Sequence, residues 1–407
     1  MDDDAPSLAT RGYAHQCAGR LAEAVASYRA AVALAPDLGD VWYNLASAYR
    51  HLGRVPEAIE AYRQALRLDP DEPAGWNNLG LALRDDGDPE QAIAAFQRAL
   101  RLAPGSAAAQ VNLGNALRDC GRRTAAVEAY LAALGADPSC VPAYFNLHAA
   151  LYRESDPEPA RRALQRALEL DPTHEGAHFH RAALELLHRG DDGGALARLP
   201  ERCDFLVDSC RYVARHRTAA TLLCADTFET LAHGLSAARS DGLVVELGVR
   251  RGTSIRFLAG LCPDGQTVHG FDAFEGLPTP WGDLPEGSYT TTGALPEVPT
   301  QVTLYPGWFA DTLPPFVRDH EQPLRLCNVD CDVYESTRVA LELLSPRVAP
   351  GTVLVFDEYL CNPSWRLDEH RAWREAVRRY GWRYDYLAFS LFTKQAAVRI
   401  RSVPGAR

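Results

Sequence analysis

The sequence predicts an α-helical solenoid followed by an α/β domain with a doubly wound, mostly parallel sheet. Proline recurs every 34 residues through the first part of the 407-residue chain, which indicates a helical repeat. From Leu243 onwards, strand-like apolar runs alternate with helical stretches, as in a parallel sheet. A glycine-containing acidic segment follows the first of these runs, at the position where such sheets bind ligands.

The repeat is carried by several residue types that return in phase. The prolines are Pro36, Pro70, Pro104, Pro138 and Pro172. The glycines are Gly19, Gly53, Gly87 and Gly121. Alanine returns at Ala24, Ala58, Ala92, Ala126 and Ala160, followed four residues later by Tyr28, Tyr62, Phe96, Tyr130 and Leu164. This pattern resembles the tetratricopeptide repeat and predicts five repeats over residues 5–172.

Each repeat is expected to form two amphipathic helices. Glycine ends the first helix in a left-handed conformation, and proline follows the second helix because it cannot continue it. A single pair of helices cannot bury its apolar face, so neighbouring pairs must stack. Residues 173–200 predict a degenerate sixth repeat or a capping helix, in which the helical rhythm is lost by Gly190.

One position of the first helix carries asparagine in four repeats. These residues are Asn44, Asn78, Asn112 and Asn146, and stacking would align them on the concave face of the solenoid. Such a row can hydrogen-bond the backbone of an extended peptide, which makes a protein or peptide partner a hypothesis for this face. The alternative is that asparagine is simply common at this position of the repeat.

The pattern changes after about residue 200, and residues 203–401 predict the α/β domain. Residues 203–238 look helical, with apolar side chains at helical spacing. The expected strands are 243–247, 267–272, 302–305, 324–330, 352–357, 384–392 and 396–401, the last two as an antiparallel hairpin. Acidic residues end four of them, at Glu246, Asp272, Asp330 and Asp357.

The turn after the first strand reads E-x-G-x-x-x-G, from Glu246 through Gly248 to Gly252, and continues with Thr253 and Ser254. It differs from the G-x-G-x-x-G turn that binds the pyrophosphate of a dinucleotide. A carboxylate suits a cofactor that carries an ammonium group, as S-adenosylmethionine does, and glycine lets the backbone approach the ligand. The alternative is a glycine-rich turn that only joins a strand to a helix.

Asp272 lies twenty residues beyond Gly252, at the end of the second expected strand. A carboxylate at this place binds ribose hydroxyls in doubly wound sheets. The flanking Phe271 and Phe274 either contact the cofactor or belong to the core, and the core is favoured for Phe271.

The second half of the chain resembles the macrocin-type O-methyltransferases, which have a Rossmann-like fold and act on sugar hydroxyls. The segments that carry the resemblance are 246–254, 271–278, 307–314, 329–334 and 356–359. The resemblance implies S-adenosylmethionine as cofactor, a divalent metal, usually Mg²⁺, and a hydroxyl group on a small molecule or glycan as acceptor. It also implies that Asp332 is the general base.

Carboxylates at the ends of the fourth and fifth expected strands form a candidate metal site. Asp330, Asp357 and Glu358 would converge there, and oxygen ligands suit a hard cation such as Mg²⁺. A metal can lower the pKa of a bound hydroxyl and orient it. Many family members have aspartate where this chain has Glu358, so Asp330 and Asp357 are the firmer candidates. The alternative is a set of helix caps and surface ion pairs.

Segment 277–299 is rich in proline and glycine and predicts a long loop that could cover a substrate. Glu369 and His370 follow on an expected helix. They could reach the site from a C-terminal lid, and the favoured alternative is that they are exposed helix residues.

Composition narrows the class of protein. The formal net charge of −11 disfavours a nucleic-acid partner, and Lys394 is the sole lysine, which disfavours lysine-based catalysis. The ten cysteines form no C-x-x-C, which disfavours structural zinc and fits a reducing cytoplasm. Met1-Asp2-Asp3-Asp4 is unlike a signal peptide, and no apolar run is long enough for a membrane span.

The sequence therefore predicts a cytoplasmic O-methyltransferase with a partner-binding repeat array. The alternative is an adaptor whose methyltransferase-like domain is inactive. A nucleic-acid or protein N-methyltransferase is disfavoured because Asn328-Val329-Asp330-Cys331 replaces the N/D-P-P-Y/F segment of enzymes that act on bases. A nicotinamide oxidoreductase is disfavoured by the glycine turn.

Overall fold

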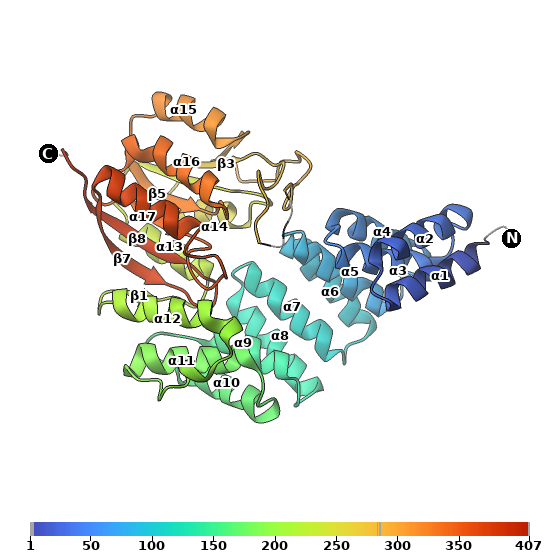
Figure 1. Ribbon diagram of the computed structural model, residues 1–407. Helices are drawn as coiled ribbons and strands as arrows, with labels where there is room; N and C mark the ends of the chain where they lie inside the picture. The colour runs from blue at the N-terminus through green and yellow to red at the C-terminus, as the bar shows by residue number, and fades with distance from the viewer. Residues whose placement is uncertain (1–3, 283, 285, 406–407) are drawn as a thin grey trace. The chain divides into compact units, whose positions relative to one another are not determined.

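The computed structural model describes residues 4–282, 284 and 286–405 (Figure 1). Two compact units divide the chain, Met1–Ala150 and Leu151–Arg407. The residues expected to be unlike a signal peptide include Met1, Asp2 and Asp3, and these three lie outside the described residues. In the described part, no helix is long and apolar enough to cross a membrane.

The first unit is a series of antiparallel helix pairs (Figure 1). Its helices are α1 (Ala5–Cys17), α2 (Leu21–Leu34), α3 (Gly39–His51), α4 (Val55–Leu68), α5 (Pro73–Asp85), α6 (Pro89–Leu102), α7 (Ala107–Asp119), α8 (Arg123–Ala136) and α9 (Val141–Leu151). The glycines at 19, 53, 87 and 121 all have positive φ, between 70° and 79°. They turn the chain between the two helices of a pair, as predicted.

Close helix packing explains the in-phase aromatic residues. Tyr28, Phe96 and Tyr130 are fully buried, each with 0% exposure. A Cβ atom added at Gly80 would lie 2.6 Å from the Phe96 ring, and one at Gly114 would lie 2.5 Å from Tyr130. Glycine at these positions lets the aromatic ring lie directly on the backbone of the neighbouring helix.

The second unit opens with α10 (Glu158–Leu170) and α11 (Glu175–Arg189), which ends at Gly190 in a left-handed cap. Two short 3₁₀ turns, η1 (Leu196–Arg198) and η2 (Glu201–Cys203), lead to α12 (Asp204–His216). The Glu154 side chain accepts a hydrogen bond from the Leu223 backbone N–H at 3.0 Å and pairs with Arg217. Helices α10 and α11 thus belong to the same compact unit as the sheet. The boundary between the two units lies at residue 150, before the change in sequence pattern near residue 200.

An eight-stranded sheet forms the centre of this unit, in the order β1-β7-β8-β6-β5-β2-β3-β4. Its strands are β1 (Leu222–Leu223), β2 (Leu243–Leu247), β3 (Val268–Asp272), β4 (Val302–Pro306), β5 (Leu324–Val329), β6 (Val353–Phe356), β7 (Arg383–Phe389) and β8 (Ala396–Ser402). β8 runs antiparallel to β6 and β7, and the other pairs are parallel. The fold class and the final hairpin are confirmed.

The short strand β1 was not predicted. Residues 203–238 were expected to be helical throughout, but β1 interrupts them between α12 and α13 (Thr227–Ala237). Two residues are too few to show an alternating pattern, and β1 exists because Leu222 and Leu223 pair with Ala388 and Phe389 of β7.

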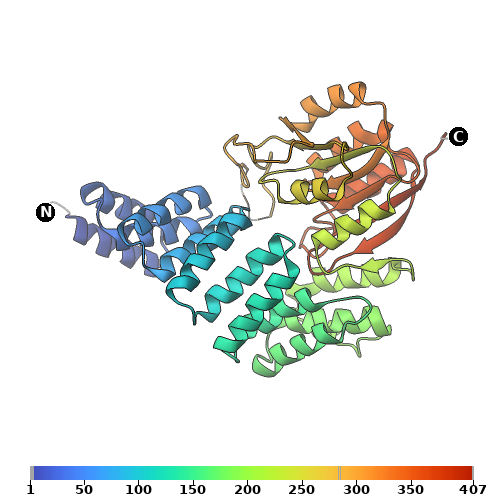
Figure 2. The same ribbon diagram turned by 180° about the vertical axis from the view of Figure 1, so that it is seen from behind.

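Helices cover both faces of the sheet (Figures 1 and 2). α13 and α14 (Thr253–Leu261) cover one face, and α15 (Phe309–Asp319), α16 (Tyr334–Leu344) and α17 (Glu369–Tyr380) cover the other. A third 3₁₀ turn, η3 (Ser345–Arg347), follows α16. The chain moves outward from β2 through β3 to β4 and then returns to β5 on the other side of β2. The point of reversal lies between β2 and β5, where doubly wound sheets bind ligands.

Candidate active site

Gly248 lies at the point of reversal, directly after β2. Its φ is 89°, and a Cβ atom added there would lie 1.8 Å from the backbone oxygen of Asp330. The Asp330 N–H donates to the Leu247 carbonyl at 2.9 Å, which brings the two strand ends together. Only glycine fits this position, since any side chain would overlap the backbone of the β5 loop.

Glu246 lies beneath this turn and has 0% exposure. Its carboxylate accepts hydrogen bonds from the Ser254 hydroxyl at 2.9 Å and from the Asn328 amide at 3.2 Å. Burial raises the pKa of Glu246 to about 8, although both hydrogen bonds oppose the rise. Glu246 and Ser254 therefore connect β2, β5 and α14, while Gly252 and Thr253 begin that helix.

Asp272 holds the glycine turn from the neighbouring strand. One carboxylate oxygen accepts from the backbone N–H groups of Val249 at 2.8 Å and Arg250 at 2.7 Å. The other accepts from the Phe274 N–H at 2.6 Å. Phe271 and Phe274 are buried in the core, at 0% and 2% exposure. Asp272 thus shapes the turn as well as facing the pocket, a role that its spacing from Gly252 did not reveal.

A pocket of about 320 Å³ opens at these strand ends. The residues that line it are Gly248, Arg250, Asp272, Ala273, Gly276, Leu277, Pro278, Tyr289, Gly307, Trp308, Phe309, Asp330, Cys331, Asp332, Ser336, Asp357 and Glu358. The structure thus brings together Gly248, Asp272 and the four predicted catalytic and metal-ligating carboxylates. Glu246 and Ser254 lie under the pocket instead of on its wall.

Besides Asp272, four carboxylates line this pocket, and their negative charges repel one another. Burial, followed by the charge of Asp357, raises the pKa of Asp330 well above its ordinary value. Burial and Glu358 raise the pKa of Asp332 to about 7. Burial also raises the pKa of Asp357, and that of Glu358 to about 7. This donor set would be stabilised by a cation among the carboxylates.

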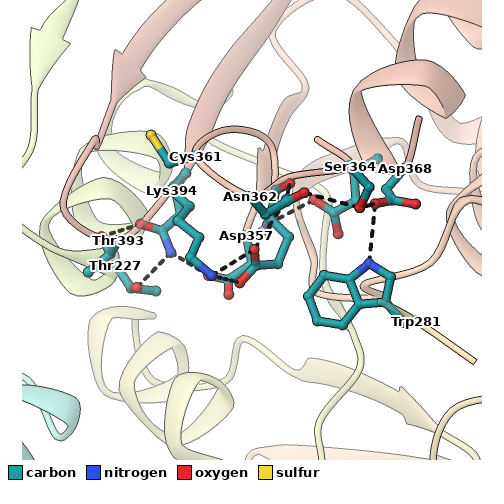
Figure 3. Close-up of polar contacts among 12 residues, drawn as sticks. Thr227, Trp281, Asp357, Cys361, Asn362, Ser364, Asp368, Thr393 and Lys394 are labelled. Carbon is teal, nitrogen blue, oxygen red and sulfur yellow. Dashed lines mark hydrogen bonds and ion pairs between the residues drawn. The ribbon is translucent and has the colours of Figure 1, made fainter. Parts of the chain in front are cut away.

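Lys394 and Gln395 hold two of these carboxylates, and sequence reasoning missed both (Figure 3). The Lys394 ammonium lies 2.9 and 3.0 Å from the two oxygens of Glu358. Burial lowers the pKa of Lys394, but the paired Glu358 carboxylate raises it above the ordinary value. The Gln395 amide donates to Asp357 at 2.5 Å and to the Thr227 hydroxyl at 2.8 Å. The only available signal was that Lys394 is the sole lysine of the chain.

Glu369 connects the two loops that carry the carboxylates. It was expected to be exposed on a helix, and the structure corrects this, because its exposure is 0%. One carboxyl oxygen accepts from the Cys331 N–H at 3.3 Å and the other from the Glu358 N–H at 3.1 Å. His370 is also buried, at 8% exposure. Glu369 is the first residue of α17, and its two oxygens bind the loop after β5 and the loop after β6.

A chain of polar contacts links the 277–299 segment to Glu358 (Figure 3). The Trp281 indole N–H donates to Asp368 at 3.2 Å, and the Ser364 hydroxyl donates to the same carboxylate at 2.5 Å. The Ser364 oxygen also lies 3.3 Å from the Asn362 side-chain oxygen, and the Asn362 amide donates to the Glu358 carbonyl at 3.0 Å. The segment, in which residues 283 and 285 lie outside the described residues, thus borders the pocket.

The backbone around the pocket is strained. Non-glycine residues adopt positive φ at Arg250, Phe274, Tyr289, Asp332, Cys361 and Lys394. Asp332, the predicted general base, has φ of 60°. Such conformations cost about 1–3 kcal/mol each and concentrate at functional sites, because the surrounding structure must hold them.

In the described part of the chain, no group of three or more His, Cys, Asp or Glu side chains is arranged to hold a metal ion. The donor chemistry nevertheless fits a hard cation, since Asp330, Asp332, Asp357 and Glu358 all face one pocket. Two of them already have protein partners, Glu358 in Lys394 and Asp357 in Gln395.

Comparison with known proteins agrees with this site. Residues 245–359 match a family model described as a methyltransferase domain, and residues 10–73 and 77–139 match a tetratricopeptide repeat model. The chain is also similar to the crystal structure of MamA, with 25% identity and a TM-score of 0.38 over 40% of this chain and 94% of that chain.

Two curated relatives are O-methyltransferases. The chain is 32% identical over 192 residues to 8-demethyl-8-(2,3-dimethoxy-alpha-L-rhamnosyl)-tetracenomycin-C 4'-O-methyltransferase of Streptomyces olivaceus, covering 41% of this chain and 69% of the relative. It is 30% identical over 195 residues to mycinamicin III 3''-O-methyltransferase of Micromonospora griseorubida, covering 40% of this chain and 70% of the relative. The resemblance predicted from the sequence is confirmed. The chain belongs to the family of S-adenosylmethionine-dependent O-methyltransferases that includes these two enzymes, and it combines that domain with tetratricopeptide repeats.

Proposed function

We propose that this enzyme methylates a hydroxyl group of a sugar, glycan or natural product in a Mg²⁺-dependent reaction. The observation that carries the proposal is the convergence of Asp330, Asp332, Asp357 and Glu358 on one pocket beside Gly248. The names of the two relatives, 4'-O- and 3''-O-methyltransferases of natural products, support a hydroxyl acceptor of this kind.

We assign the following roles in methyl transfer to residues of the pocket. Gly248 and Asp272 form the wall on which the cofactor binds, and Asp332 accepts the proton of the acceptor hydroxyl. Asp330 and Asp357 would hold the metal, with Glu358 as a third ligand when its ion pair with Lys394 opens. Bound Mg²⁺ would lower the pKa of the hydroxyl, which brings it within reach of a carboxylate base. The Arg250 guanidinium carbon lies 4.5 Å from the centre of the Tyr289 ring. These two side chains would cover the part of the pocket that receives the acceptor.

The first experiment is a calorimetric titration of the full chain with S-adenosylhomocysteine, with and without Mg²⁺. We expect binding in both conditions. Asp332→Asn should bind the product normally and lose methyl transfer to a panel of deoxysugar glycosides, followed by mass spectrometry. Asp208→Asn, a change in a surface ion pair, is the matched control. Failure of the folded wild-type chain to bind S-adenosylhomocysteine would instead favour the alternative of an inactive adaptor.

The carboxylate cluster predicts how metal and pH affect stability. Asp332 and Glu358, whose pKa values burial raises to about 7, bind protons more tightly in the folded chain than in the unfolded chain. Without metal, their contribution to the free energy of unfolding therefore falls as the pH rises from about 4 to about 8. We expect Mg²⁺ to raise the melting temperature more at pH 8 than at pH 5, and Asp332→Asn to reduce this difference. An equal effect of Mg²⁺ at both pH values, or none, would contradict the metal assignment.

We also propose that the repeats bind an extended peptide or protein segment along the asparagine row. Asn44, Asn78, Asn112 and Asn146 are all partly exposed. Asn78 donates to the Tyr43 hydroxyl at 2.5 Å and Asn112 donates to Asn77 at 2.9 Å, so the side chains are held in place between repeats. Peptide-array binding should weaken in Asn44→Ala and Asn146→Ala, and unchanged binding in both would exclude the row as the binding site.

The cytoplasm is the proposed location. All ten cysteines are free thiols, six of them buried, which suits a reducing compartment. Cell fractionation of the native protein tests this, and recovery from an extracytoplasmic fraction would contradict it.

A further inference from the structure

A groove of about 470 Å³ lies between α12 and α17, and its lining shares no residue with the methyl-transfer pocket. It is lined by Tyr212, Arg215, His216, Arg366, His370, Arg371, Arg374, Glu375 and Arg378. We call it the arginine groove. It concentrates positive charge in a chain whose formal net charge is −11.

Positive charge in the groove is not balanced by its neighbours. Glu375 is the one lining carboxylate, and it already accepts from Tyr334 at 2.6 Å and Arg371 at 2.9 Å. Arg366 is paired with Asp208 through two hydrogen bonds, at 2.6 and 2.8 Å.

The other three arginines of the groove are Arg215, Arg374 and Arg378. Among the described residues, no carboxylate lies within 4.0 Å of their guanidinium groups. The groove therefore keeps three guanidinium groups whose charge no protein carboxylate neutralises.

The arginines of the groove lie close together on two helices. Arg371, Arg374 and Arg378 follow one another on one face of α17, where like charges repel. Arg215 adds a further charge from α12. Arginines from two different helices therefore line one groove.

His370 is an independent sign that the groove receives a ligand. Its side chain lines the groove at 8% exposure, and its buried Nε2 atom has no hydrogen-bond partner. A buried polar atom without a partner costs about 1–3 kcal/mol. Burial, with Arg366 and Arg374, lowers the pKa of His370 to about 4, which reflects the positive field in the groove.

We propose that the arginine groove binds a phosphate-bearing ligand at a second site of the enzyme, with one or two phosphate groups held by Arg215, Arg374 and Arg378. Planar guanidinium groups bind phosphate oxygens in pairs, and a phosphate offers enough oxygens for several arginines. The volume of the groove accommodates a diphosphate. The phosphate belongs either to a soluble phosphorylated compound or to a lipid headgroup.

Pyrophosphate is the probe for the soluble source. We expect the full chain, saturated with S-adenosylhomocysteine to occupy the other pocket, to bind pyrophosphate in calorimetry at low ionic strength. Arg215→Ala with Arg378→Ala should weaken the affinity at least about tenfold, since each removes a charge-assisted hydrogen bond. Both arginines are exposed and lack carboxylate partners, so the variant should fold. Arg379→Ala is the matched control, because Arg379 lies on the same helix but pairs with Glu342 outside the groove.

Vesicles test the lipid source. Binding to phosphatidylglycerol vesicles but not to phosphatidylcholine vesicles, lost in the double variant, would assign the phosphate to a headgroup. The proposal is overturned if wild-type chain binds neither pyrophosphate nor anionic vesicles, or if the double variant binds them as tightly as the control. Arginine-dependent binding of an RNA oligomer without either phosphate probe would also overturn it.

Discussion

Replacement of Gly248 by alanine is expected to abolish S-adenosylhomocysteine binding and to destabilise the α/β unit by about 4 kcal/mol or more. The left-handed conformation at φ of 89° alone costs an alanine about 1–2 kcal/mol. The larger effect is steric, because the new Cβ atom would lie 1.8 Å from the Asp330 carbonyl oxygen. The β2 and β5 loops would have to separate, and the wall of the pocket would separate with them.

Gly265→Ala is the matched control for this prediction. Gly265 also has a positive φ, of 86°, but a Cβ atom there would meet nothing within 4 Å. We expect the control to lose only the conformational contribution and to bind S-adenosylhomocysteine normally. Thermal unfolding and calorimetry measure both variants. Equal melting temperatures and affinities in the two would show that the contact with Asp330 is not what requires glycine.

Replacement of Glu369 by glutamine is expected to lower kcat about 100-fold while the affinity for S-adenosylhomocysteine changes little. Glu369 accepts hydrogen bonds from the Cys331 and Glu358 N–H groups with its two oxygens. Glutamine keeps one acceptor and turns an amide N–H₂ toward the other N–H. One carboxylate-bearing loop would shift, and Asp332 or Glu358 would move from its catalytic position.

The separation of kcat from product affinity distinguishes this positioning role from a general loss of folding. Burial, followed by the charge of Asp357, raises the pKa of Glu369 well above its ordinary value. Glu335→Gln, in an exposed ion pair with Arg338, is the control and should retain full kcat. A Glu369→Gln enzyme with unchanged kcat would remove Glu369 from the positioning role.

Local pattern was enough to predict most of the architecture. The 34-residue period specified the helix pairs, because the residues that recur at each position have the same burial from copy to copy, as the in-phase alanines do at 0% exposure. The strands 243–247 and 396–401 were predicted almost to the residue, since a buried strand is a short apolar run bounded by turns. The carboxyl ends of parallel strands meet at one edge of a sheet, so the sequence could predict which residues lie close together there. These residues are Gly248, Asp272, Asp330, Asp332, Asp357 and Glu358.

Residues that reach the site from distant segments could not be predicted in this way. Glu369 bonds Cys331 across 38 positions, and Lys394 pairs with Glu358 across 36 positions. Neither position carries a local signal of burial, because a helix start and a hairpin turn are exposed in most proteins. β1 was missed for the same reason, since its two residues form a strand only through β7.

The sequence by itself thus determined the helical repeat, the positions of seven strands along the chain and the identity of the carboxylates at their ends, because these features depend on residues close together in the chain. The tertiary structure alone decided that Lys394 neutralises Glu358, that Glu369 joins the two carboxylate loops and that α12 and α17 enclose the arginine groove. Those arrangements depend on how helices and loops far apart in the chain pack on the sheet, and no periodicity in the sequence records that packing.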